Sequence, residues 1–189
     1  IVKNSFRTGE PVEVVFDVPK ARECPIKKID TYQFSPDGSK ILIATETTPI
    51  YRHSYTAVHY LYPVKRNDKG VTTNNIVEKL SDGGPQQAPV FSPDGNLVAF
   101  VRDNNIFLVK LLYGNSESQV TEDGKLNSVL NGIPDWVFEE FGFNRALEFY
   151  ADNTMLAYVR FDESEVPSYT FPLFAGEAPR HDALQDYPG

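Results

Sequence analysis

The sequence has one cysteine, Cys24, in 189 residues, and it contains no long apolar run. A lone cysteine cannot form an internal disulfide, and no stretch approaches the roughly 18 apolar residues of a membrane-spanning helix. Basic residues are outnumbered, with 18 Lys and Arg against 26 Asp and Glu and a net charge of -8. We therefore expect no nucleic acid and no anionic membrane surface as a partner.

Histidine is nearly as scarce, with three residues in the chain. His53 and His59 lie in a segment that we expect to be one strand, which would put them on one face but too far apart to share a metal ion. His181 is remote from both in sequence. Because no cluster of Cys or His accompanies them, we expect no metal site, and nothing in the sequence calls for a cofactor.

Proline, glycine and aromatic residues are plentiful, with 14 Pro, 12 Gly and 13% aromatic residues. This composition favours short strands and tight turns over long helices. An apolar strand, a polar turn and a second apolar strand recur three times at a nearly constant spacing of roughly 57 residues. The turn reads Ser-Pro-Asp-Gly in the first two copies.

A strand pair repeated at fixed spacing is typical of radial β repetition, in which each sheet packs against its neighbours. We therefore predict an all-β fold, a partial β-propeller made of several antiparallel blades of a larger ring. Residues 29–44, 88–109 and 146–160 should form equivalent antiparallel strand pairs in successive blades.

Residues 132–143 contain the only tryptophan, Trp136, and two adjacent carboxylates, Glu139 and Glu140, in an otherwise apolar stretch. A carboxylate among apolar groups loses hydration unless a cation or hydrogen-bond donors replace the water. Such a pair is therefore suited to receive a cation, for which the terminal ammonium of a peptide is one candidate. The alternative is that both glutamates lie on the solvated face of a short amphipathic helix.

That helix is expected at 134–141, inserted between blades. Pro134 suits the first helical turn, and the negative charge of Asp135 in that turn favours the positive end of the helix.

Arg52 is the second candidate, since it interrupts the aromatic segment 47–62, which we expect to be a strand. An arginine flanked by tyrosines can be a solvated strand residue whose aliphatic stem packs on the rings. Its guanidinium can instead bind a carbonyl or carboxylate as a fork of donors.

Three motifs carry a resemblance to a known family. They are Y-R-H-S-Y-T-A at 51–57, G-I-P-D-W-V-F-E-E at 132–140 and R-F-D-E-S-E-V-P at 160–167. Their residues, order and spacing resemble the N-terminal propeller of dipeptidyl peptidase IV over most of residues 29–173. That family consists of serine exopeptidases in which an eight-bladed propeller caps an α/β-hydrolase domain. They release dipeptides from peptide N-termini after a penultimate Pro or Ala.

The resemblance implies a substrate-binding role for all three candidate residues. Glu139 and Glu140 would bind the free ammonium of the substrate, and Arg52 would reach a substrate carbonyl near it. The family often has three consecutive acids at this point, whereas this chain has two. We align Glu139 and Glu140 with the last two of the three.

No G-x-S-x-G sequence occurs in the chain, so we expect no catalytic triad in it. Residues 1–189 are then a partial N-terminal propeller domain, inactive alone, from an enzyme that supplies the rest of the propeller and the hydrolase domain. Because the chain opens with Ile1, without Met or a signal peptide, we expect a processed or excised piece. The resemblance implies export to the periplasm or cell envelope of a bacterium, and leaves open a homodimeric parent. A non-catalytic, protein-binding β-propeller scaffold is the alternative, since it would share the repeats.

Overall fold

The predicted all-β class is confirmed by a computed structural model, which describes residues 1–112, 114–172 and 184–188. All paired strands of the described residues are antiparallel, and the helix among them is α1 (Trp136–Glu140). Within these residues no helix is long and apolar enough to cross a membrane.

The first repeat forms a four-stranded sheet whose first two strands are joined by the Ser-Pro-Asp-Gly turn. Ser35 Oγ and the Ser39 amide donate to Asp37 Oδ1 at 2.6 and 3.0 Å, and Gly38 has a φ of +69°, which a glycine adopts without strain. In sheet order the strands are β3 (Thr31–Phe34), β4 (Lys40–Pro49), β5 (Tyr55–Pro63) and β8 (Glu78–Lys79).

The second repeat builds the same four-stranded sheet with the same turn chemistry. Ser92 Oγ and the Asn96 amide donate to Asp94 Oδ1 at 2.6 and 3.0 Å. Asp103 and Asn104, with φ values of 49° and 61°, make the tight turn of the next hairpin. The strands are β9 (Gln87–Phe91), β10 (Leu97–Arg102), β11 (Asn105–Lys110) and β12 (Ser116–Gln119).

The third repeat keeps the strand pair in a shorter form. β14 (Leu147–Phe149) pairs with β15 (Leu156–Tyr158), and β13 (Val129–Asn131) pairs with β16 (Arg160–Asp162). The remaining two-stranded pairs are β1 (Val2–Asn4) with β2 (Pro11–Val14), β6 (Arg66–Asn67) with β7 (Gly70–Val71), and β17 (Ser168–Pro172) with β18 (Leu184–Pro188). The three predicted strand pairs are thus present.

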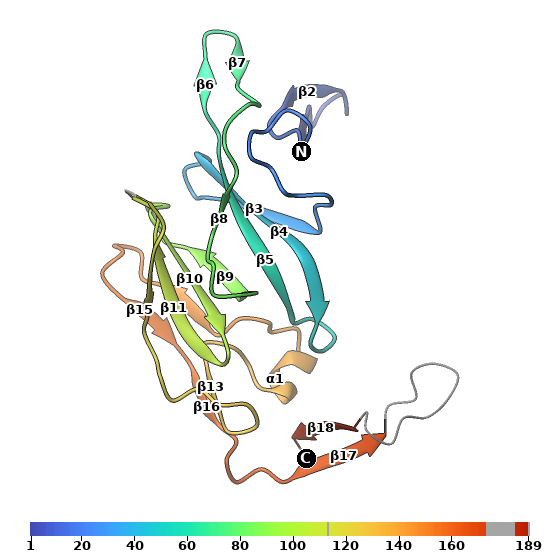
Figure 1. Cartoon of the computed structure of the whole chain (residues 1–189), viewed down its shortest axis with the longest axis vertical. Helices are drawn as coiled ribbons and strands as arrows, with labels where there is room; N and C mark the ends of the chain where they lie inside the picture. The colour runs from blue at the N-terminus through green and yellow to red at the C-terminus, as the bar shows by residue number, and fades with distance from the viewer. Residues whose placement is uncertain (113, 173–183, 189) are drawn as a thin grey trace.

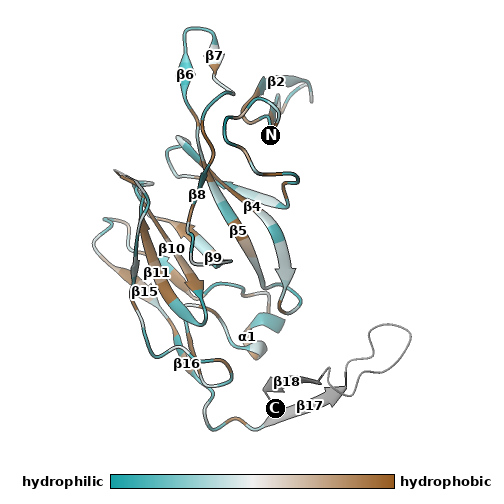
Figure 2. Ribbon diagram, viewed as in Figure 1, coloured by the Kyte–Doolittle hydropathy of each residue, from teal (hydrophilic) through white to brown (hydrophobic). Residues whose placement is uncertain are grey.

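Buried clusters lie between successive sheets, and a further one packs Ile41, Ile43 and Tyr62 of the first sheet against the N-terminal residues Val15 and Phe16. One buried cluster joins Leu42 and Leu61 of the first sheet to Val98 and Phe100 of the second. Another joins the opposite face of the second sheet to the third unit, through Val90, Val101, Ile106, Leu130 and Leu147. Figure 2 shows the apolar residues concentrated along β10 and β11, the strands that are packed on both faces. This face-to-face order is that of successive propeller blades.

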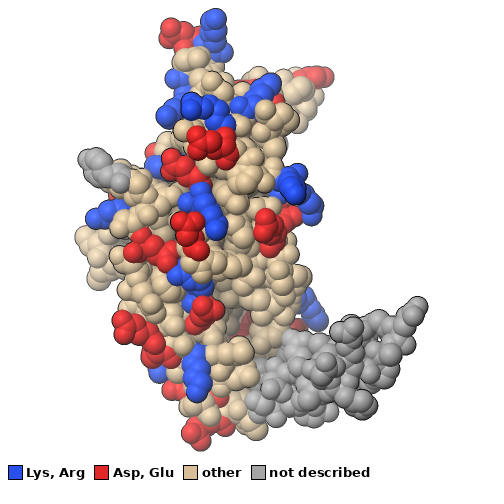
Figure 3. Space-filling view, viewed as in Figure 1, with Lys and Arg blue, Asp and Glu red and all other residues tan. Residues whose placement is uncertain are grey.

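The described sheets follow one another without closing a ring (Figure 1). The β6–β7 hairpin lies at one end of the molecule, and α1 lies near the turn between β4 and β5. On the face shown in Figure 3, basic and acidic side chains are interspersed.

Candidate functional site

The turn that joins β4 to β5 carries Arg52, and here the expected single strand over 47–62 is wrong. β4 ends at Pro49 and β5 begins at Tyr55. The amides of Ile50 and Tyr51 both donate to the carbonyl oxygen of Ser54, at 2.9 and 3.4 Å, and close the turn. Residues 50–54, called the 50–54 turn below, therefore place Arg52 and His53 beyond the ends of β4 and β5. His53 and His59 do not share a strand face.

Helix α1 forms within the predicted range of 134–141, but it starts later than expected. Asp135 is its N-cap and accepts a hydrogen bond from the Phe138 amide at 2.8 Å, so Pro134 precedes the helix instead of opening its first turn. Gly132, with a φ of +76°, lets the chain turn into the helix where a Cβ would lie 2.8 Å from the Leu147 side chain. The helix ends at Glu140, and just beyond it the Gly142 amide donates to the Glu139 carbonyl at 2.8 Å.

The carboxylate of Glu139 is buried against the 50–54 turn, and the side chain is 2% exposed. Its Oε1 accepts the His53 amide at 2.7 Å and the Ser54 amide at 2.9 Å. Its Oε2 accepts the Ser54 hydroxyl at 2.7 Å. Three donors thus replace the water that this carboxylate loses on burial.

Glu140, the next residue of α1, points to the surface and meets Arg52. Arg52 Nη1 lies 3.2 Å from Glu140 Oε2, with 69% of the Arg52 side chain and 40% of the Glu140 side chain exposed. The fold therefore brings all three predicted site residues together. The Glu139 carboxylate is buried against the turn, whereas Arg52 and Glu140 form an ion pair at the surface.

The apolar residues around α1 are largely solvent-accessible, in contrast to the desolvated setting that the sequence suggests. Phe138 packs on Phe161 at a ring separation of 5.5 Å and on Phe143 at 6.3 Å. The exposed large side chains of this region are Trp136, Val137, Phe138, Phe141 and Phe143.

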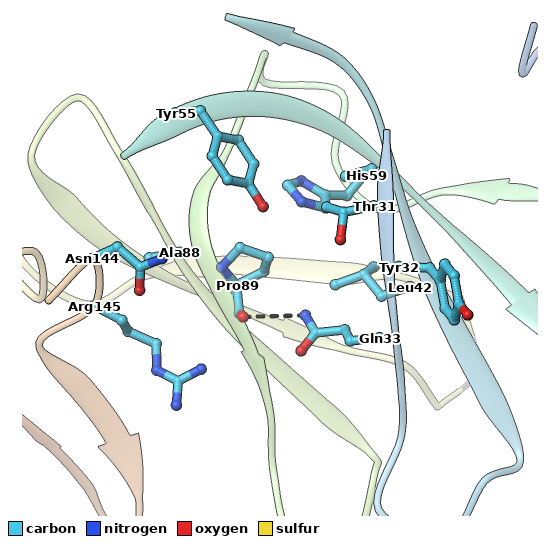
Figure 4. Close-up of a pocket in the computed structure, with 11 residues that line it drawn as sticks. Thr31, Tyr32, Gln33, Leu42, Tyr55, His59, Ala88, Pro89, Asn144 and Arg145 are labelled. Carbon is cyan, nitrogen blue, oxygen red and sulfur yellow. Dashed lines mark hydrogen bonds between the residues drawn. The ribbon is translucent and has the colours of Figure 1, made fainter. Parts of the chain in front are cut away.

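A cavity of about 200 Å³ lies between β3, β5 and β9, close to the turn (Figure 4). Gln33 Nε2 crosses it to donate to the Pro89 carbonyl at 3.2 Å. Burial lowers the pKa of His59 to about 4, against a smaller opposing effect of its hydrogen bond with Gln86. Burial also raises the pKa of Tyr55. His59 is therefore neutral at pH 7 and adds no positive charge to the cavity wall.

A second hollow of about 370 Å³ lies on the Arg52 side of the turn. It shares Thr31 and Tyr55 with the cavity in Figure 4, so the two spaces are neighbours. A ligand at Arg52 would thus have room beside the 50–54 turn.

In the part of the chain that the structure describes, no group of three His, Cys, Asp or Glu residues is placed to hold a metal ion. His59 instead bonds Gln86 Oε1 through Nδ1 at 3.0 Å. His181 lies outside the described residues.

Comparison with known proteins decides the family. A family model described as "Dipeptidyl peptidase IV (DPP IV) N-terminal region" matches residues 35–189. The chain belongs to this family. The crystal structure of Porphyromonas gingivalis dipeptidyl peptidase 4 superposes with a TM-score of 0.84 at 45% identity, over 98% of this chain and 25% of that one. The observed sheets thus match the N-terminal propeller region of a dipeptidyl peptidase IV, as the three motifs predict.

Two curated relatives are similar to most of the chain. "Dipeptidyl peptidase 4" of Trichophyton rubrum is 39% identical over 146 residues, which are 76% of this chain and 17% of the relative. "Prolyl endopeptidase FAP" of Mus musculus is 34% identical over 152 residues, which are 79% of this chain and 19% of the relative. The chain therefore spans a small part of the length of these relatives.

Ser54 is the site residue that sequence reasoning missed. It lies inside the Y-R-H-S-Y-T-A motif of the dipeptidyl peptidase IV family, yet nothing local marks its hydroxyl as a partner of Glu139. The sequence signal for Ser54 was its position directly after Arg52 and His53 in this motif.

Proposed function

We propose that this chain is the ammonium-binding, substrate-gating propeller portion of a serine-type dipeptidyl peptidase, which releases X-Pro or X-Ala dipeptides from peptides with a free N-terminus. The observation that carries the proposal is the ion pair of Arg52 with Glu140 at the surface, next in sequence to the buried Glu139. Membership in the dipeptidyl peptidase IV family supplies the reaction class.

Glu140 supplies an exposed carboxylate to the site, next to the buried Glu139, and Arg52 supplies donors. A carboxylate has two oxygens and about four lone-pair sites, so Glu140 can keep Arg52 on Oε2 and still accept bonds from an ammonium. Arg52 has five N–H donors in a planar fork, enough to hold Glu140 and a substrate carbonyl together. The pair therefore offers one acceptor and one donor to the first residue of a peptide.

Such a site measures distance from the N-terminus. Two extended residues span about 7 Å, so an ammonium fixed that far from a nucleophile places the second peptide bond at the reaction centre. An internal segment of a peptide has no ammonium and would leave the acidic site unpaired. The site would thus select dipeptide removal over internal cleavage.

The ion pair is better explained by such a role than by stability. Both partners are well exposed, and a surface pair of this kind contributes about 0 to 1 kcal/mol to folding. Its replacement should therefore leave the fold intact and change ligand binding.

Hydrolysis itself would come from residues outside this chain, because the chain has no G-x-S-x-G sequence. The missing remainder of the propeller and an α/β-hydrolase domain are the partners in this proposal. A periplasmic or cell-envelope location in a bacterium belongs to the same proposal and rests on the family resemblance.

The test is Glu140→Gln in the full-length protein, assayed with a Gly-Pro chromogenic substrate. A bound peptide would cover Glu140, and loss of one partner of a charge pair buried in this way costs about 2 to 5 kcal/mol, so kcat/KM should fall roughly 30-fold or more. Glu13→Gln is the matched control, because Glu13 also pairs with an arginine, Arg66 at 2.8 Å, but on β2, away from α1. Equal activity of the two variants would argue for a binding scaffold without this site.

A further inference from the structure

The two adjacent glutamates of α1 have opposite environments. Glu139 is 2% exposed, whereas 40% of the Glu140 side chain is exposed. Successive helical residues point about 100° apart, so a helix that turns one of them into the protein turns the other toward a different side. The pair is therefore not a pair of equivalent ligands.

Both oxygens of Glu139 are already occupied by the 50–54 turn. Two successive amides, of His53 and Ser54, donate to Oε1, and the Ser54 hydroxyl donates to Oε2. These bonds fill three of the roughly four acceptor sites of the carboxylate, and Glu139 is 2% exposed, so an ammonium could reach it only by opening the contact between α1 and the turn. Opening that contact would leave buried N–H groups without an acceptor, which is costly. Glu139 is thus poorly placed to bind a ligand directly.

The same bonds determine where Arg52 and Glu140 lie. Arg52 directly precedes the residues that Glu139 holds, and Glu140 directly follows Glu139. Helix α1 has five residues, too few to be stable without tertiary contacts. Its N-cap Asp135 closes the first turn of the helix, while Glu139 joins the helix to the sheet.

We propose that Glu139 is a positioning residue, which fastens α1 to the 50–54 turn and so sets Glu140 beside Arg52, and that Glu140 alone contacts the substrate ammonium. This inference rests on the proposed function. Ser54 shares the positioning role, because its amide and its hydroxyl supply two of the three bonds.

The glutamine variants separate positioning from direct binding. In Glu139→Gln the amide oxygen can still accept both N–H groups, and its NH₂ can donate to the Ser54 hydroxyl, so the contacts survive without the charge. A positioning residue tolerates this change, whereas an ammonium ligand does not.

The experiment uses the full-length protein and two substrates, a Gly-Pro chromogenic peptide and its analogue without the N-terminal amine. The ratio of their kcat/KM values, called the amine preference, reports ammonium recognition. Glu139→Gln should keep the amine preference within about threefold of wild type, whereas Glu140→Gln and Glu139→Ala should each lower it roughly 30-fold or more.

Serine variants give a matched control for stability. Ser54→Ala removes the hydroxyl that donates to Glu139, and Ser81→Ala removes an equally buried hydroxyl that donates to Glu117. Both changes should lower the Tm, and Ser81→Ala should lower it more, because Ser81 Oγ also accepts bonds from Arg102 Nη1 and the Gly83 amide. Only Ser54→Ala should lower the amine preference, by roughly 3- to 10-fold.

The outcomes distinguish the inference from the function on which it rests. Equal loss of amine preference in Glu139→Gln and Glu140→Gln would make Glu139 a ligand and overturn the inference, with the proposed function intact. Glu139→Ala and Ser54→Ala variants that lower only the Tm would also overturn it. Wild-type amine preference in Glu140→Gln would remove the proposed function itself, and this inference with it.

Discussion

Acidification should destabilise the first blade through His59, which lies in β5 beside the cavity in Figure 4. Its backbone amide and its Nδ1 both donate to Gln86 Oε1, at 3.1 and 3.0 Å, in a site where the ring is 2% exposed. Burial holds the pKa of the folded state at about 4, below the ordinary value of 6.5. The folded protein thus favours the neutral ring.

The sign follows from proton binding. Between pH 6.5 and 4 the unfolded chain binds a proton at His59 and the folded chain does not. The contribution of the neutral His59 to the free energy of unfolding is therefore fully present above pH 6.5 and is lost as the pH falls through this window. With these two pKa values the loss relative to pH 7 is about 2 kcal/mol at pH 5 and about 3 kcal/mol at pH 4.

The assay compares wild type with His59→Asn, which keeps a side-chain N–H for Gln86 but does not titrate. Amide hydrogen exchange of β5 in the full-length protein, measured at pH 7, 5 and 4, gives the local free energy of opening for each. Relative to pH 7, the opening free energy of the wild type should fall below that of the variant by about 2 kcal/mol at pH 5 and about 3 kcal/mol at pH 4. The other titrating groups are the same in both proteins, so their effects cancel. Parallel pH dependences would refute the assignment of a neutral, buried His59.

Three further predictions concern the blades, the helix and the isolated chain. Arg102→Ala should lower the free energy of unfolding in urea by about 2 to 4 kcal/mol. The reason is that the Arg102 side chain is 13% exposed, pairs with Glu117 at 2.5 Å and lies 4.1 Å from the Phe107 ring centre. An unchanged urea midpoint would contradict this. Asp135→Ala should cost about 1 kcal/mol of helix stability, seen as faster exchange of the Phe138 amide, while equal protection would exclude a capping role. The purified 189-residue chain should not cleave the Gly-Pro substrate, and it should self-associate at micromolar concentration because the third unit leaves Tyr150, Met155 and Tyr158 exposed. Inhibitor-sensitive turnover or a monodisperse monomer in sedimentation would contradict these expectations.

The repeats were predictable because their turn chemistry is local. In Ser35-Pro-Asp-Gly38 every bond that closes the turn is made within six residues, and the same holds after Ser92. Such short-range contacts are written directly in the sequence. The strand pairs and their packing as blades followed from them.

The 50–54 turn was not predictable in the same way. It contains no glycine, and part of what fixes it is Glu139, a residue far along the chain. For the same reason the sequence could not separate the buried Glu139 from the exposed Glu140. The two residues are identical and adjacent, and only the tertiary contact with the turn decides which of them is buried. Family resemblance identified both residues without showing this difference.

The most direct test of the proposed site is a crystal structure of the full-length protein with a bound X-Pro dipeptide. The account predicts the ammonium nitrogen within about 3 Å of a Glu140 carboxylate oxygen, with Arg52 on a ligand carbonyl and the three bonds from the 50–54 turn to Glu139 unbroken. A dipeptide bound with its ammonium elsewhere, and with Glu140 still paired only to Arg52, would contradict it.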